Sequence, residues 1–442
     1  MKYVVFAFAA LGVPPLALLL WVNLRWARYV IWGVFAALCL YQATAINFFS
    51  HEKYAGSSRG MEVSLIHLLA LALLAALALR RKVQSWLPDG GFRIYVLYFL
   101  LCLPSLAAAD SVLISWFELW KMILLFFFYL AVYTYLKASD DVPSILGGIV
   151  FFVVVNFVVV VKMHYSGVYQ PGGLFPHRNC MAMSMNLFGP VFFAFYLTNG
   201  IGGLFRTSVF LALACAAVAM LWSYSRGAIA VAPVGYGITA AACLFEGKNG
   251  FGKFKRLLPI ILVGIVGVAA VLPRVIERFA KAPTSSGDTR VELAYCASEM
   301  IKDEPMRGVG INNWSLKMSP PHDYQARASE IVGRELDYTG IVETVYLLVG
   351  AECGLPALAA MLLWFGWYWV RCLGLLRRLR KSRWFFVPAG LLGGLTANYM
   401  QSVLEWVLRQ QMNLICLMFV FAVISYLHSD WRRLAQHGKE RG

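Results

Sequence analysis

Charged residues are scarce in this sequence. Asp, Glu, Lys and Arg make up 14% of its 442 residues, whereas soluble domains usually contain about 25%. Hydrophobic residues make up 60% of the chain and aromatic residues 15%. Apart from residues 273–340, no stretch is long and polar enough to form a separate globular domain. The composition therefore excludes a soluble enzyme and predicts an integral membrane protein.

The sequence also lacks the patterns of metal-binding and disulfide-stabilised proteins. Its nine cysteines are scattered singly, mostly inside apolar runs, and no two of them form a C-x-x-C pair. No H-E-x-x-H or D-x-D pattern is present, and His51, His164 and His322 do not have the spacing of a metal site. We therefore expect the cysteines to be small core residues, and we expect no metal or other cofactor.

Long apolar runs, in contrast, recur along the whole chain, close to the roughly 20 residues that cross a bilayer as a helix. They lie at residues 3–21, 29–48, 63–80, 93–109, 117–136, 144–162, 182–199, 207–223, 227–245, 257–272, 341–369, 385–403 and 412–428. We therefore predict an all-α polytopic membrane protein with about 12–13 transmembrane helices, in one integral membrane domain over residues 1–442. Residues 273–340 form a long, partly helical loop between two of these helices.

Basic residues exceed acidic residues by 39 to 23, which gives a net charge of +16. They cluster on one side of the membrane if the helices alternate strictly: at Arg25 and Arg28, and in residues 80–82, 248–256, 371–383 and 432–441. The positive-inside rule makes this side cytoplasmic, so loop 273–340 faces the outer side of the membrane. The charge then indicates orientation and not nucleic-acid binding, because no soluble basic patch with interleaved aromatic residues exists.

The N-terminal segment allows two arrangements. Strict alternation places Met1 outside and the C-terminus inside. Alternatively, Pro14 and Pro15 turn residues 1–22 into a re-entrant hairpin, which removes one crossing and leaves both ends inside. Lys2 and the apolar run after it resemble the start of a signal peptide, but no small-residue cleavage site precedes Trp21. We therefore expect an uncleaved anchor.

Three arginines fall in the predicted outer loops: Arg178 in GGLFPHRNCMAM, Arg226 in SYSRGAIA and Arg290 in SSGDTRVELAY. A guanidinium near the hydrocarbon edge is costly unless it finds a partner. Arg226 either extends to the lipid headgroups or joins the other two in a diphosphate clamp, because the planar guanidinium binds phosphate oxygens bidentately. The glycine- and proline-rich loop 167–181 runs into a helix whose first N–H groups also suit an anion.

Three further features concern ionisable side chains. His177 either titrates beside Arg178 or hydrogen-bonds a carbonyl group. Glu343 opens the helix after the long loop, where it acts either as a proton acceptor or as an acid favoured by the helix dipole. Glu118 and Lys121 lie at i and i+3 inside a membrane helix, where pairing would neutralise both charges.

Residues 290–302 have helical spacing. Val291, Tyr295 and Ser298 fall on one face, together with Ala294 and Ile301. We therefore expect an amphipathic helix that lies over the outer ends of the membrane helices.

The order of these stretches resembles the O-antigen ligase and polymerase family. The matching stretches are GGLFPHRNCMA, SYSRGA, Arg290 followed by SEMIKDEPMRGVGINNW, and ETVYLLVGAECGLPAL, which together cover residues 170–360. The resemblance implies a metal-independent glycosyltransferase that takes a glycan from undecaprenyl diphosphate at the periplasmic face. In the ligase branch a hydroxyl of the lipid A core attacks the anomeric carbon, in lipopolysaccharide biosynthesis.

The resemblance also implies roles for residues. Arg226 and Arg290 would hold the diphosphate, since a leaving diphosphate needs charge stabilisation. Where the family has His-Asn before x-Tyr-Leu, this chain has Glu343 and Thr344, so Glu343 takes the place of the general base or that role is not essential. The candidate substrate-binding residues are Arg178, His177, Asn179, Tyr346 and Asn313.

Other functions remain open at this stage. A polymerase would use the same donor but a second lipid-linked glycan as acceptor, and a protein-directed oligosaccharyltransferase would modify a polypeptide. A lipid-linked oligosaccharide flippase or another transporter is less consistent with the sequence, because the ionisable groups gather at one membrane face and no inverted repeat is visible. The expected partners are the undecaprenyl-diphosphate-linked glycan, the lipid A core and membrane lipids, without nucleic acid.

Overall fold

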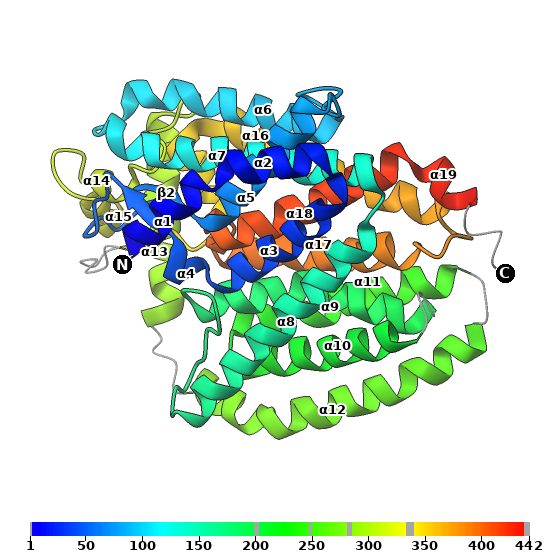
Figure 1. The fold of residues 1–442 in the computed structure, drawn as a ribbon. Coiled ribbons are helices and arrows are strands. Elements are labelled where there is room, and N and C mark those ends of the chain that lie inside the picture. The colour runs from blue at the N-terminus through cyan, green and yellow to red at the C-terminus, as the bar shows by residue number, and fades with distance from the viewer. Residues whose placement is uncertain (1, 199–202, 247–249, 281–284, 333–339, 437–442) are drawn as a thin grey trace.

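The computed structural model describes residues 2–198, 203–246, 250–280, 285–332 and 340–436, and within them the chain is almost entirely helical (Figure 1). The first half contains α1 (Lys2–Leu11), α2 (Val13–Val22), α3 (Ala27–Cys39), α4 (Tyr41–Thr44), α5 (Leu65–Leu79), α6 (Gly90–Cys102), α7 (Val112–Ser139), α8 (Val142–Tyr165), α9 (Arg178–Thr198) and α10 (Leu204–Trp222). The second half contains α11 (Arg226–Phe245), α12 (Gly250–Ala280), α13 (Ser285–Asp303), α14 (Trp314–Lys317), α15 (Tyr324–Val332), α16 (Val345–Arg378), α17 (Phe386–Leu404), α18 (Gln411–Ser429) and α19 (Trp431–Gln436).

Short elements complete the described part of the chain. Three 3₁₀ helices lie at η1 (Leu24–Trp26), η2 (Leu103–Ala108) and η3 (Val407–Arg409). Strand β1 (Ile46–Phe48) pairs antiparallel with β2 (Met61–Val63), with Asn47 opposite Glu62.

The prediction of an all-α polytopic membrane protein is confirmed. Among the described residues, nine helices are long and apolar enough to cross a membrane, and every predicted apolar run overlaps a helix, although run 29–48 ends in strand β1. Helices α9 and α18 are almost wholly buried and form the centre of the bundle, whereas α12 runs along its edge in Figure 1. Helix α12 continues to Ala280, so the first eight residues of the predicted loop 273–340 belong to it.

The N-terminal segment Lys2–Val22 is helical across Gly12, without the turn that a re-entrant hairpin requires. Gly12, between α1 and α2, keeps helical backbone angles (φ −72°, ψ −15°). The N–H of Gly12 donates to the carbonyl of Phe8 at 3.0 Å, and the N–H of Leu16 donates to that of Gly12 at 3.1 Å. Pro14 and Pro15 occupy the first turn of α2, where a proline interrupts no hydrogen bond. The predicted proline break is therefore wrong.

The bundle has two chemically different ends. At one, which we call the basic end, Arg80 donates to the carbonyl of Trp21 at 2.6 Å and Arg380 to that of Glu246 at 3.0 Å. Arg433 is paired there with Asp140. At the other, the outer end, α13, α14 and α15 gather beside the start of α1, while α19 lies at the far side of Figure 1. The described basic clusters thus meet at one end, as the alternation of helices requires.

Helix α13 is amphipathic, as predicted, and its buried face is not the one that carries Val291 and Tyr295. Val291 and Tyr295 are 55% and 41% exposed. The buried side chains are instead those of Leu293, Cys296, Ala297 and Met300, which pack with residues of α15 and α16. These positions have the i, i+3, i+4, i+7 spacing of a single helical face, which places α13 flat on the outer end of α16.

Candidate functional site

A kink in α16 fastens the outer helices to the membrane bundle. Gly354 interrupts the helix with φ +82°, and a Cβ there would lie 2.6 Å from the backbone of Met306, so only glycine fits. The loop after α13 uses the backbone groups near the kink: Val309 donates to the carbonyl of Ala351 at 2.9 Å, and Leu355 donates to that of Pro305 at 2.8 Å. The sequence stretches GVG and ECGLP therefore serve to hold α13, which carries Arg290, over α16.

The loop before α9 places Arg178 at the first residue of that helix. Gly173 has φ +60°, and the next residue, Leu174, donates its N–H to Asn156 Oδ1 at 2.9 Å. His177 is exposed, and its Nδ1 accepts the N–H of Asn179 at 3.3 Å. This hydrogen bond ties His177 to the first turn of α9.

A tight turn starts α11 with Arg226. Tyr224 has φ +50°, its ring stacks on Tyr169 with centroids 5.5 Å apart, and the N–H of Ser225 donates to Ser223 Oγ at 3.1 Å. Arg226 is half-buried at this helix start.

Glu405, directly after α17, lies where these elements meet. A Cβ on Gly227, the neighbour of Arg226, would be 3.7 Å from Glu405 Oε1. Arg290 Nη2 is 3.9 Å from the same oxygen, and the side chain of Asn179 donates a hydrogen bond to the carboxylate. Arg290 also pairs through Nε with Glu343. We call Arg178, Asn179, Arg226, Arg290, Glu343 and Glu405 the Glu405 cluster.

The two carboxylates of this cluster differ in environment. The side chain of Glu405 is 9% exposed, whereas that of Glu343 is 34% exposed. Burial and the nearby charge of Glu343 raise the pKa of Glu405 to about 7, although Asn179, Arg290 and Arg178 act in the opposite direction. Glu405 can therefore exchange a proton near neutral pH.

The sequence predicted five of the six members of this cluster and missed Glu405. The only signal was its place as the single acidic residue in the outer segment 404–411. Its partners come from α9, α11, α13 and the residues before α16, so their meeting depends on the fold.

Two candidate substrate-binding residues lie elsewhere. Asn313 is fully buried, and its amide nitrogen donates to Ser115 Oγ at 2.8 Å and to the carbonyl of Ile311 at 2.9 Å. Its Oδ1 accepts the N–H of Ser111 at 2.9 Å. Asn313 thus ties the outer loop to α7, and the prediction that it binds substrate is not supported by its contacts.

Tyr346 faces a groove between α16 and α17, with a volume of about 430 Å³. Its hydroxyl donates to the carbonyl of Tyr399 at 2.9 Å. Apart from the hydroxyl of Thr396, the lining is aromatic and aliphatic, and it ends at Val403, two residues before Glu405. This α16–α17 groove is thus an apolar surface whose lining includes Tyr346 and Val403, three residues after Glu343 and two residues before Glu405.

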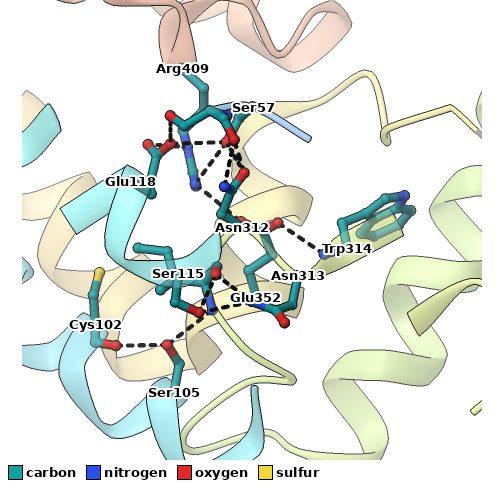
Figure 2. A network of polar contacts seen from close by, with 12 residues as sticks. Ser57, Cys102, Ser105, Ser115, Glu118, Asn312, Asn313, Trp314, Glu352 and Arg409 are labelled. Atoms are coloured by element: carbon teal, nitrogen blue, oxygen red, sulfur yellow. Dashed lines mark hydrogen bonds and ion pairs between the residues drawn. The ribbon is translucent and has the colours of Figure 1, made fainter. Parts of the chain in front are cut away.

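A buried polar network supports the outer end (Figure 2). Lys121 and Glu118 of α7 form the predicted pair at 2.7 Å. Arg409 then bridges two carboxylates, with its Nε 3.0 Å from Glu118 and its Nη2 3.1 Å from Glu352. Each charge is thus neutralised by a neighbour, as buried charges require. The network fixes the segment after α17, and with it Glu405.

Positive charge in the Glu405 cluster comes from arginine side chains. The described residues contain no group of three His, Cys, Asp or Glu side chains that would hold a metal ion.

Comparison with known proteins identifies the central part of the chain. Residues 211–362 match the family model described as O-Antigen ligase. This range contains Arg226, Arg290 and Glu343, while Arg178 and Glu405 lie outside it. The resemblance seen in the sequence is confirmed, and the chain carries the domain of a family of glycosyl-transferring ligases and polymerases. No curated protein matches the chain.

Proposed function

We propose that this protein, which carries an O-antigen ligase domain, ligates O-antigen polysaccharide from undecaprenyl diphosphate onto lipid A core in lipopolysaccharide biosynthesis. It would act at the periplasmic face of the bacterial inner membrane. The observation that carries the proposal is the Glu405 cluster, in which Arg178 and Arg290 lie near Glu343 and Glu405, beside the start of α11 with Arg226, at the end opposite the basic clusters. An O-antigen polymerase with the same donor is the alternative.

The surroundings of the cluster suit a polyprenyl diphosphate donor. The arginines provide the charge that a diphosphate needs, and the first turns of α9 and α11 add backbone N–H groups. The α16–α17 groove offers an apolar surface for a polyprenyl tail, since it lies between two membrane helices and its lining residue Val403 is two residues from Glu405. Such a lipid requires both features: positive charge for its diphosphate and an apolar groove for its tail.

Transfer would proceed in one displacement. The acceptor hydroxyl attacks the anomeric carbon, the bond from that carbon to the diphosphate oxygen breaks, and the arginines stabilise the diphosphate that leaves. We propose that Glu405 accepts the proton of this hydroxyl, because Glu405 is buried and its pKa is near 7. Arg290 already occupies one oxygen of Glu343, so Glu343 would act by orienting Arg290 beside Glu405.

Deletion of the gene tests the function in cells. We expect lipopolysaccharide gels of the deletion strain to show core without attached chains, with glycan accumulating on undecaprenyl diphosphate. Core that carries a single repeat would indicate a polymerase instead. An unchanged gel profile would contradict both.

The proposed orientation predicts how introduced cysteines are labelled. Eight of the nine native cysteines are buried and one is half-buried, so background labelling will be low. We expect cysteine at the exposed position Ala326, in α15, to react with an impermeant maleimide once the outer membrane is permeable. Cysteine at the exposed Lys381, at the basic end, should react only after the inner membrane is lysed. The reverse pattern would invert the orientation.

A further inference from the structure

A polar cavity of about 410 Å³ opens at the outer end, beside the Glu405 cluster. Its volume is in the usual range for small-molecule sites, roughly 300–1,000 Å³. Three parts of the chain build it: the start of the protein up to β2 with the loop between the strands, the outer part of α7, and residues 406–412. Pro176, in the loop before α9, closes the wall.

The lining presents hydrogen-bonding groups that the protein itself does not use. The side chains of Asn47, Arg59 and Gln410 line the cavity, and within the described part of the chain these three side chains form no hydrogen bond; those of Gln42 and Gln411, which also line it, are paired with Leu174 and His67. A planar amide carries both donors and acceptors, and a guanidinium carries several donors at fixed angles. Such groups match the paired hydroxyls of a sugar ring.

Aromatic rings give the same cavity an apolar surface. Trp406 lines it and is half-buried, whereas Phe117 is fully buried in the wall behind it. An aromatic face is rigid and apolar while its edge tolerates polar neighbours, which suits the C–H face of a pyranose. Polar groups and aromatic rings in one cavity favour a saccharide over a purely apolar or a purely ionic ligand.

The floor of the cavity is held in place by the buried network. Ser58 Oγ donates to Glu118 at 2.5 Å, and Lys121 Nζ donates to Ser58 Oγ at 3.0 Å. Ser57 Oγ donates to the same carboxylate at 3.0 Å (Figure 2). Because these side chains are already fixed, a ligand would lose little free energy in ordering them.

The position of the cavity links it to transfer. Val403 lines the α16–α17 groove, Glu405 belongs to the cluster, and Trp406 lines the cavity, so only two residues separate the lining residues of the apolar and polar sites along the chain. All residues that line the cavity lie outside residues 211–362, the range matched by the family model. The cavity is therefore built by the part of the chain that the family match does not include.

We propose that this polar cavity binds a sugar residue of one of the two glycolipid substrates and so determines which glycan is used. The proposal rests on the proposed function. It names the class of ligand, a pyranose with free hydroxyl groups, and the side chains that recognise it: Asn47, Arg59 and Gln410, with Trp406 beneath the ring.

Binding to the full-length protein in nanodiscs tests this inference. The probes are the core oligosaccharide released from lipid A and the O-antigen saccharide released from its lipid. We expect the double variant Asn47→Ala with Gln410→Ala to bind one of the two probes at least about tenfold more weakly than the wild type does, because two hydrogen bonds are lost. Gln84→Ala, an exposed amide between α5 and α6, is the matched control and should bind like the wild type.

The outcomes separate the alternatives. Weaker binding of the core oligosaccharide identifies the acceptor as the occupant, and weaker binding of the O-antigen saccharide identifies the donor. Unchanged affinity for both, or no binding of either by the wild type, would overturn the inference. If the double variant is less thermally stable, Arg59→Met, at an exposed position, replaces it. Failure of the wild type to transfer glycan would contradict the proposed function without changing these binding results.

Discussion

Alanine in place of Arg226 or Arg290 is expected to lower glycan transfer by about 10²-fold or more, with little change in thermal stability. Each substitution removes a charged donor from the leaving diphosphate, and a single donor of this kind contributes about 10²–10³ in rate. Arg226→Lys should restore activity only in part, because an ammonium group cannot make the bidentate contact. Transfer between purified donor and acceptor in proteoliposomes measures the effect.

The control for these variants is Lys381→Ala, which removes an exposed positive charge at the basic end. It should transfer at the wild-type rate. Full activity in both Arg226→Ala and Arg290→Ala would dismiss the diphosphate clamp. Arg290→Ala should have a second effect, because Arg290 lowers the pKa of Glu405. Without it, any remaining activity should require a higher pH.

Replacement of Glu405 by glutamine is expected to lower the transfer rate by about 10²–10⁴-fold, the usual contribution of a general base. The amide keeps the volume and the contact with Arg290 but accepts no proton at neutral pH. In the wild type the carboxylate must be ionised to accept the proton. The rate should therefore fall as the pH is lowered through about 7, the pKa of Glu405. This acidic limb should disappear in Glu405→Gln.

Glu343→Gln is the matched comparison, because it changes the other carboxylate beside Arg290. We expect a smaller loss of rate and an acidic limb that moves to lower pH, since the charge of Glu343 raises the pKa of Glu405. Glu343→His, which restores the residue that the family pattern has there, should keep measurable activity. The opposite ranking, with near-normal turnover in Glu405→Gln and none in Glu343→Gln, would make Glu343 the proton acceptor.

Hydropathy and the spacing of charges were sufficient to predict most of the fold. The apolar runs form helices, and the described basic clusters meet at one end. Both properties are local in the sequence and follow from the cost of burying charge in lipid. Pro14 and Pro15 wrongly suggested a hairpin turn. They lie in the first turn of α2, and the sequence alone does not show where that helix starts. Residues 290–302 were correctly predicted as a helix, but the buried face depends on what α13 packs against.

The candidate site was predictable only in part, for a related reason. Arg178, Arg226 and Arg290 were recognisable because arginines at the outer ends of apolar runs are costly and few. Glu405 was not recognisable, because its side chain is buried and its pKa is raised only when α9, α11 and α13 surround it in the folded protein. Asn313 shows the converse: its partners Ser111 and Ser115 precede it by about 200 residues, and only the fold shows that they occupy its amide.

The most direct test of the account is the product formed by the purified protein. Proteoliposomes that contain the protein would receive an undecaprenyl-diphosphate-linked glycan and lipid A core, without added metal ions, and the lipids would be analysed by mass spectrometry. The account predicts lipid A core enlarged by the mass of the glycan, with an equal amount of undecaprenyl diphosphate released. Glycan joined only to a second lipid-linked glycan, or no covalent product at all, would contradict it.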